Sequence, residues 1–245
     1  RDKLKFSRFE SYDYFKISST EPIKYKLKFG VKNSDEEQLR FLLWNIFLQN
    51  DFSLKYETLK FRAGQLPIIN NALRRNDTIG LLPTGSGKSV CYQLCAILQP
   101  AISFVVCPIK SLMYDQKADL DSAFFTRVNH ITSDDDGEDK EHIQKQFGLG
   151  KFFFIFISPE RFQLKTFRQY FSSVNQEFNI AYAVIDEVHC LSEWGHDFRT
   201  SYLNLSNTIQ RLCSDFNFLG LTATASINVL KDIQIEFGIK QENVK

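Results

Sequence analysis

From about residue 55 onward, apolar positions follow two alternating patterns. Short, nearly continuous apolar runs are typical of parallel strands covered on both faces, while segments with apolar residues every three or four positions predict amphipathic helices. The predicted strands are 78–82, 103–107, 128–131, 152–157, 181–185 and 218–221. The predicted helices are 62–73, 88–98, 111–120, 138–147, 159–171, 202–212 and 227–237. This alternation predicts an α/β fold with a mostly parallel sheet and helices on both faces.

The run Phe-Phe-Phe-Ile-Phe-Ile at 152–157 carries no polar residue. Such a segment would aggregate if it were exposed, so we expect it to form a central strand of the sheet. No apolar run approaches the ~18 residues that a membrane-spanning helix needs, and we therefore expect no membrane partner.

The first 50 residues have a different pattern. Residues 24–29 alternate between polar and apolar side chains, which predicts an amphipathic strand, and Ser-Asp-Glu-Glu at 34–37 forms a capping box before a helical run at 39–48. We expect an N-terminal extension of unknown role at 1–50 and one large domain at 51–245. The extension is either a small accessory unit or a decoration packed against the main lobe.

Composition narrows the function only slightly. The chain has 245 residues, of which 43% are hydrophobic and 24% charged, with a net charge of +1. This net charge is not the basic excess expected of a self-sufficient nucleic-acid-binding module, so the charge alone does not indicate a partner. The five cysteines are odd in number, lie in apolar contexts and match no usual zinc spacing. We expect reduced, buried thiols in a cytosolic protein.

A phosphate-binding loop follows the first predicted strand. Residues 82–89 read Leu-Pro-Thr-Gly-Ser-Gly-Lys-Ser, close to the P-loop pattern except that Leu82 replaces the first glycine. Small residues let backbone N–H groups turn toward a polyphosphate at the positive end of the following helix. Lys88 would reach the outer phosphates, and the Ser89 hydroxyl would bind Mg²⁺. The residues expected around the phosphates are Thr84, Gly85, Ser86, Gly87, Lys88 and Ser89.

Two carboxylates end the apolar run at 181–185. Asp186 and Glu187 would lie at the carboxyl edge of the sheet, where open α/β folds bind their ligands. We expect Asp186 to hold Mg²⁺, directly or through its water, and Glu187 to polarise the attacking water. The loop and the carboxylates together predict a nucleotide-hydrolysis site.

Further motifs occur in a specific order. Phe-Arg-Ala-Gly-Gln at 61–65 precedes the phosphate loop, and Cys-Tyr-Gln-Leu at 91–94 follows it. Other motifs are those at 105–116 and 157–161, the Trp-Gly-His-Asp-Phe-Arg segment at 194–199 and Leu-Thr-Ala-Thr-Ala at 221–225. Over about residues 55–245 this order resembles the first RecA-like lobe of RecQ-family DNA helicases, a branch of helicase superfamily 2. The segment at 194–199 is the most specific element of the resemblance.

The resemblance implies several roles. The cofactors would be ATP and Mg²⁺, with Arg62 and Gln65 reading the adenine. His189, Thr222 and Thr224 would link hydrolysis to the DNA-facing surface. Residues implied along the single-strand path are Ser111, Asp115, Gln116, Pro159, Glu160 and Arg161. The loop 192–199 would sense single-stranded DNA, with rings of Trp194 and Phe198 for stacking on bases and with His196 and Arg199 for phosphates.

The sequence also departs from the family pattern. Thr58 occupies the position where an aromatic residue often stacks on adenine, so selectivity for adenine is less secure than hydrolysis. Val188, Glu193 and Cys95 replace the usual Ala, Gln and Pro. Glu193 adds a negative charge to the proposed DNA-contacting loop and would weaken or retune its response to DNA.

Three functions stay open at this point. The leading one is a motor lobe that couples ATP hydrolysis to 3′-to-5′ translocation on single-stranded DNA and to duplex unwinding. The others are an RNA helicase or duplex translocase of the same superfamily, and a nucleotide-dependent scaffold without unwinding. Expected partners are single-stranded and forked DNA and a second RecA-like lobe, which would carry the arginine finger.

These 245 residues do not contain that second lobe. An arginine finger contributes ~10³–10⁵ in the rate of phosphoryl transfer. On their own the residues should therefore bind nucleotide weakly, hydrolyse it very slowly and unwind nothing. We expect the protein in the cytoplasm with the nucleoid if its source is bacterial, and in the nucleus if it is eukaryotic.

Overall fold

A parallel sheet forms the centre of the molecule. The computed structural model describes residues 23–24, 34–48, 55–123, 125–132, 137–192, 200–202, 204–213 and 215–245. These form a six-stranded sheet in the order β1-β6-β5-β2-β4-β3, and every neighbouring pair is parallel. The strands are β1 (Thr78–Leu81), β2 (Ile102–Val106), β3 (Val128–Ile131), β4 (Phe154–Ile157), β5 (Ile180–Asp186) and β6 (Asn217–Thr222). The predicted parallel α/β fold is confirmed.

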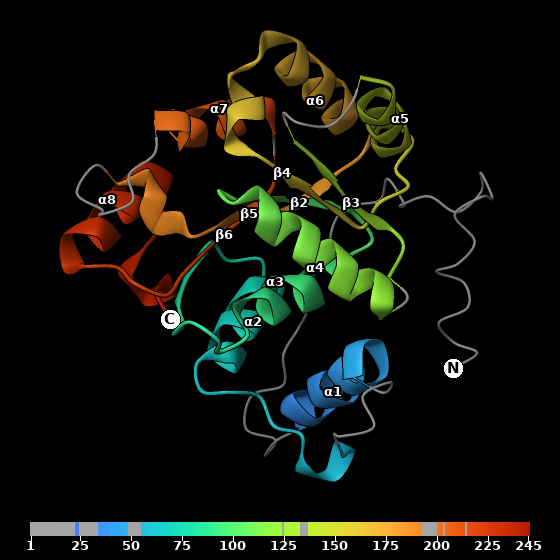
Figure 1. The fold of residues 1–245 in the computed structure, drawn as a ribbon. Helices are drawn as coiled ribbons and strands as arrows, with labels where there is room; N and C mark the ends of the chain where they lie inside the picture. The colour runs from blue at the N-terminus through green and yellow to red at the C-terminus, as the bar shows by residue number, and fades with distance from the viewer. Residues whose placement is uncertain are drawn as a thin grey trace.

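Helices lie on both sides of this sheet (Figure 1). One side carries α1 (Ser34–Leu43), α2 (Gln65–Leu73), α3 (Lys88–Ile97) and α4 (Lys110–Ser122), and the other carries α5 (Gly137–Gly148), α6 (Lys165–Glu177), α7 (Leu205–Leu212) and α8 (Ile227–Phe237). Two clusters of buried apolar side chains fill the two layers between helices and sheet. None of the described helices is long and apolar enough to cross a membrane.

Residues 154–157 of the aromatic run form an interior strand, as predicted, while the first two residues of the run precede it. β4 pairs with β2 on one edge and β3 on the other. Because side chains alternate along a strand, Phe154 and Phe156 pack into the cluster under α2, α3 and α4, whereas Ile155 and Ile157 pack into the opposite one. An apolar residue is therefore needed at every position of this strand.

Two predicted helices are each interrupted in the structure. The segment 159–171 divides into a 3₁₀ turn, η4 (Pro159–Gln163), and α6, because Leu164 is extended with φ −81° and ψ 123°. Similarly, 202–212 divides into η6 (Thr200–Tyr202) and α7, since Asn204 has a left-handed backbone with φ 58°. The apolar spacing continues across both breaks, which is why it predicted single helices.

The described part of the N-terminal segment packs on the main lobe. Leu39 and Leu43 of α1 are buried, and the π-helical turn η2 (Trp44–Leu48) stacks Phe47 on Phe125 at 5.4 Å between ring centroids. The predicted strand 24–29 lies outside the described residues apart from Lys24. The division between domains at residue 50 remains a prediction.

The predicted burial of the cysteines is confirmed, since all five are buried, and each is a free thiol. The strand order also positions the functional residues. β6 lies between β1 and β5, so the carboxyl ends of these three strands meet at one edge of the sheet. The phosphate loop follows β1, Thr222 ends β6 and Asp186 ends β5. The fold thus brings together residues from three distant parts of the chain.

Candidate active site

The phosphate loop turns through two glycines with left-handed backbones. Gly85 has φ +74° and Gly87 has φ +81°, conformations that side chains other than glycine's rarely adopt. Lys88 then begins α3, so the loop ends at a helix N-terminus. Leu82, at the position of the missing glycine, is 1% exposed and packs beneath Gly64. The substitution therefore places a core side chain before the loop and leaves the two turning glycines intact.

Arg62 and Gln65 hold this loop from the side. The Gln65 Nε2 donates to the backbone oxygens of Ser86 and Gly87, at 3.0 Å each, and its Oε1 accepts from the backbone N–H of Arg62 at 2.8 Å. The Arg62 guanidinium donates to the Gly85 oxygen. Both residues lie against the loop, as expected for a nucleotide site. That they read adenine remains a prediction.

Lys88 and Glu187 form an ion pair across the site. The Lys88 Nζ lies 2.5 Å from the Glu187 Oε1, although the two residues come from different strand–loop units. Glu187 follows the last residue of β5 with a left-handed backbone, φ 49°, which is uncommon for a residue with a side chain. The predicted meeting of the phosphate loop and the acidic motif is thus observed.

The two neighbouring carboxyl groups have opposite pKa shifts. Burial, followed by the Glu187 charge, raises the pKa of Asp186 to about 6. Burial would also raise the pKa of Glu187, but hydrogen bonds from His189 and Lys88 outweigh it and lower that pKa to about 2. At neutral pH Glu187 is therefore a firm anion, whereas Asp186 is ionised with little margin.

A polar chain leads from Glu187 to the end of β6. The Glu187 Oε2 lies 3.3 Å from the His189 Nδ1, which is also 2.7 Å from the Thr222 Oγ1. Thr222 in turn accepts from the backbone N–H of Thr224 at 3.3 Å. Hydrogen bonds with Cys190 and Glu187 raise the pKa of His189 to about 10. The predicted grouping of His189, Thr222 and Thr224 is present, and their coupling role remains a prediction.

A second polar chain runs beneath the loop, and the sequence did not predict it. Tyr92 of α3 is fully buried, and its hydroxyl donates to the Gln116 Oε1 of α4. The Ser89 hydroxyl lies within hydrogen-bonding reach of the Tyr92 hydroxyl. Burial and the nearby Asp186 charge raise the pKa of Tyr92 well above its usual range, so the hydroxyl keeps its proton. The motif at 91–94 drew attention to this part of the sequence, but it did not indicate a role for Tyr92.

The donor set fits Mg²⁺. Ser89 supplies a hydroxyl at the start of α3, and Asp186 supplies a buried carboxylate whose Oδ1 accepts from the Glu187 N–H at 3.0 Å. Within the described part of the chain, no cluster of three or more His, Cys, Asp or Glu side chains could hold a metal alone. Mg²⁺ is commonly bound by one or two protein oxygens together with substrate phosphates and water, so this sparse set is suitable.

The residues predicted to contact DNA or to link it to hydrolysis have different environments. Ser111, Asp115 and Thr224 are exposed. Gln116 is 7% exposed, and Arg161 is 8% exposed with its guanidinium 5.0 Å from the centre of the Phe167 ring. Contact of the last two with a strand would require their side chains to move. Trp194, His196, Phe198 and Arg199 lie at 193–199, outside the described residues.

Fold and site together define a RecA-like nucleotide-hydrolysing lobe. The model of the DEAD/DEAH box helicase family matches residues 62–233. The chain belongs to this family, and its relatives support the resemblance to the first RecA-like lobe of RecQ-type helicases.

Similar proteins cover most of this chain. The ATP-dependent DNA helicase Q1 of Mus musculus is 37% identical over 200 residues, 76% of this chain. The ATP-dependent DNA helicase RecQ of Haemophilus influenzae is 33% identical over 180 residues, 74% of this chain. This chain spans 28% of the length of each. Among solved structures, the DUF1998 helicase MrfA bound to DNA shares the fold, with a TM-score of 0.61, 16% identity and coverage of 97% of this chain and 31% of that one.

Proposed function

We propose that this lobe binds ATP with Mg²⁺ and couples its hydrolysis to 3′-to-5′ translocation on single-stranded DNA and to duplex unwinding. A second RecA-like lobe in the same protein would complete the motor. The observation that carries the proposal is the ion pair between Lys88 and Glu187, 2.5 Å long, beside the buried Asp186. It joins the groups that phosphoryl transfer requires at one edge of the sheet.

The site's own residues divide the chemical work. The backbone N–H groups of the loop and the start of α3 would hold the phosphates. Lys88 would break its ion pair with Glu187 and form one with the outermost phosphate. Glu187, still hydrogen-bonded to His189, would then orient the attacking water and accept its proton. Mg²⁺, when bound, neutralises charge on the phosphate oxygens. Its proposed protein ligands are Ser89 and Asp186.

Two chains of polar side chains offer routes from this chemistry to a bound strand. One passes from Glu187 through His189 and Thr222 to the exposed Thr224. The other passes from Ser89 through Tyr92 to Gln116 in α4. Each chain joins the nucleotide site to residues predicted to lie near DNA. Loss or gain of the γ-phosphate could therefore change their geometry.

The choice of DNA and of polarity rests on similarity. The relatives in mouse and Haemophilus influenzae carry the name DNA helicase, and the polarity follows from the resemblance to RecQ-family motifs. An RNA helicase or duplex translocase remains the alternative, while Lys88, Asp186 and Glu187 in one site favour an enzyme over a scaffold.

The test uses the full-length protein. ATP hydrolysis is measured with single-stranded DNA, single-stranded RNA and blunt duplex DNA, and unwinding is measured on duplexes with a 3′ or a 5′ tail. We expect the strongest stimulation by single-stranded DNA and unwinding of the 3′-tailed duplex, both abolished by Glu187→Gln. Stronger stimulation by RNA or blunt duplex would contradict the choice of DNA. Preference for a 5′ tail would contradict the polarity.

A further inference from the structure

A polar cleft opens between η4, α6 and α7, away from the nucleotide site. One part, of about 320 Å³, is lined by Phe162, Gln163, Arg168, Ser201, Asn204, Leu205 and Thr208. An adjoining part, of about 550 Å³, is lined by Arg168, Asn204, Asn207, Thr208, Arg211 and Leu212. Three shared residues make the two parts continuous. We call the whole the α6–α7 cleft, and its volume lies in the ~300–1,000 Å³ range of ligand sites.

The lining carries positive charge without opposing charge. Arg168 and Arg211 contribute two guanidiniums, and the other lining residues are amides, hydroxyl side chains and apolar groups. Among the described residues, neither arginine forms an ion pair with a carboxylate. A cleft with this composition favours an anion that can accept several hydrogen bonds.

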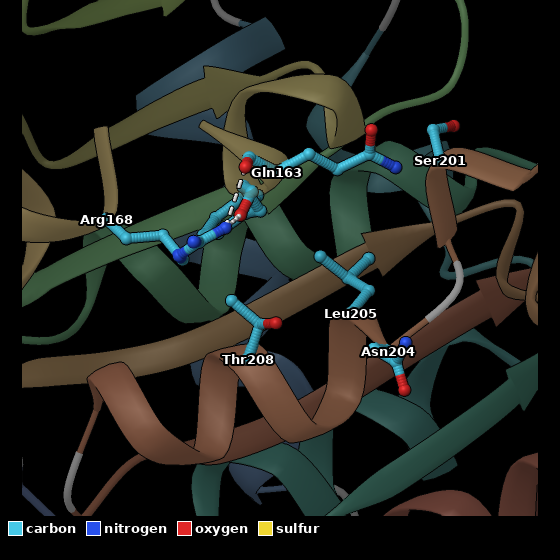
Figure 2. Close-up of a pocket in the computed structure, with 7 residues that line it drawn as sticks. Gln163, Arg168, Ser201, Asn204, Leu205 and Thr208 are labelled. Atoms are coloured by element: carbon cyan, nitrogen blue, oxygen red, sulfur yellow. Dashed lines mark hydrogen bonds between the residues drawn. The ribbon is translucent and has the colours of Figure 1, made fainter. Parts of the chain in front are cut away.

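Arg168 is held in position by the backbone of η4. Its Nη1 donates to the Phe162 oxygen at 2.9 Å and to the Gln163 oxygen at 2.7 Å. Figure 2 shows these bonds, with the side chains of Leu205 and Thr208 rising from α7 toward Arg168 and Gln163. Because one nitrogen is anchored, the rest of the guanidinium keeps a fixed orientation, and little side-chain entropy is lost when it binds an anion.

The position of the cleft suggests which anion it binds. η4 directly follows the carboxyl end of β4 and contacts η6, which supplies Ser201. The residues predicted along the single-strand path include Arg161 of η4, and the next two residues, Phe162 and Gln163, line the cleft. A strand that crosses the ends of β2 and β4 would therefore meet the α6–α7 cleft as it leaves the sheet edge.

We propose that the α6–α7 cleft binds the phosphodiester backbone of single-stranded DNA, as an extension of the strand path beyond the carboxyl ends of the strands. The proposal rests on the proposed function, since it needs a strand at that edge. The cleft contributes charge and amide donors without base-reading geometry, so binding there is independent of sequence. Its effect is a longer binding site with a steeper dependence on salt.

The experiment measures equilibrium binding of the full-length protein to oligothymidylates of about 4 to about 16 nucleotides, the range of common single-strand site sizes, at several salt concentrations. The variants are Arg211→Gln, which removes one exposed charge, and Asn207→Asp, which adds an opposing one. Lys231→Gln is the matched control, because this exposed lysine lies on α8 and does not line the cleft. All three positions are on the surface, so the variants should fold.

We expect Arg211→Gln to weaken binding of long oligonucleotides only and to reduce the slope of log affinity against log salt by about 0.7, the value for one phosphate contact on a single strand. Asn207→Asp should weaken the same oligonucleotides, and Lys231→Gln should match wild type. Equal slopes for Arg211→Gln and wild type would overturn the proposal. The proposal would also be overturned if Arg211→Gln changed how strongly inorganic phosphate or polyglutamate competes for the cleft but left DNA binding unchanged. If wild type binds no oligonucleotide of any length, the proposed function fails as well.

Discussion

The Lys88 ammonium and the Glu187 carboxylate neutralise each other, with 2.5 Å between Nζ and Oε1. Lys88 is the group expected to contact the outer phosphates, and Glu187 the group expected to orient water. A triphosphate that attracts Lys88 must therefore weaken this ion pair and release the carboxylate. Through this one contact, nucleotide binding would be linked to activation of the base.

Replacement of Glu187 by glutamine should separate binding from hydrolysis. We expect turnover with single-stranded DNA to fall by ~10²–10⁴, the contribution of a positioned general base. Nucleotide affinity should be unchanged or higher, because Lys88 loses a competing anion. Steady-state ATPase and equilibrium nucleotide binding of the full-length protein measure the two effects. Glu236→Gln, at an exposed position of α8, is the control. Undiminished turnover would remove Glu187 from the chemistry.

The raised pKa of Asp186 predicts how binding depends on pH. The carboxyl group is mostly ionised at pH 7.5 and mostly protonated at pH 5, since burial raises its pKa to about 6. Mg²⁺-dependent nucleotide affinity should therefore fall as the pH is lowered through about 6. Titration of a fluorescent ATP analogue with and without Mg²⁺ tests this. An affinity that stays constant from pH 7.5 to pH 5 would contradict it.

The same shift predicts a stabilising substitution. The folded-state pKa of Asp186 lies above the unfolded value of 3.8, so its contribution to stability is full below pH 3.8 and is lost as the pH rises through about 6. At pH 7.5 the ionised group is a net cost, and Asp186→Asn should increase the free energy of unfolding by about 1–3 kcal/mol. Urea denaturation at pH 7.5 measures this, with exposed Asp119→Asn as the control. A loss of stability in Asp186→Asn would refute the prediction.

Thr222→Val removes a hydroxyl while it keeps the side-chain shape. Thr222 is fully buried and its Oγ1 lies 2.7 Å from the His189 Nδ1, so the variant leaves a charged donor without this partner. We expect the free energy of unfolding to fall by about 1.5–3 kcal/mol. The ratio of DNA-stimulated to basal ATPase should fall by about fivefold or more, within the usual range of coupling energies. A preserved ratio would exclude Thr222 from the coupling path.

Alanine variants of three glycines with similar backbone conformations distinguish the cost of backbone strain from a loss of nucleotide binding. Gly85, Gly87 and Gly238 have φ of +74°, +81° and +64°. An alanine Cβ would lie 2.7 Å from the Gln65 Nε2 at position 87, but would contact nothing within 4 Å at the other two. All three alanine variants should lose about 1 kcal/mol or more of stability. Gly87→Ala should lose the most nucleotide affinity, whereas Gly238→Ala, at the end of α8, should retain it. Equal affinities in all three would contradict the site geometry.

The sequence predicted the sheet well because each strand is a buried apolar run. The predicted strand 128–131 coincides with β3, and the predicted helix 227–237 coincides with α8. The predicted boundaries were wrong where buried apolar residues continue beyond the hydrogen-bonded part of a strand or helix. Phe152 is buried but precedes β4, and the apolar spacing of η4 and α6 hides the extended backbone at Leu164.

The nucleotide site was predictable for a related reason. Parallel strands bring their carboxyl ends to one edge, so motifs after β1, β5 and β6 had to meet there. The orientation of single side chains was harder to predict. The burial of Gln116 and Arg161 depends on the rotation of α4 and η4 about their axes, and the sequence did not indicate the partners of Tyr92. Arg168 and Arg211 share no motif, and only the packing of α6 beside α7 brings them into one cleft.

The loop and the two carboxylates should form one site for ATP with Mg²⁺. The sharpest test measures equilibrium binding of a fluorescent ATP analogue to the wild-type protein and to Lys88→Ala. We expect saturable binding that Mg²⁺ strengthens, and an affinity at least about tenfold lower in Lys88→Ala, since one charge-assisted contact contributes ~1.5–3 kcal/mol. Lys231→Ala should behave as wild type. Equal affinities for wild type and Lys88→Ala, or binding that does not depend on Mg²⁺, would show that the loop and the carboxylates do not form such a site.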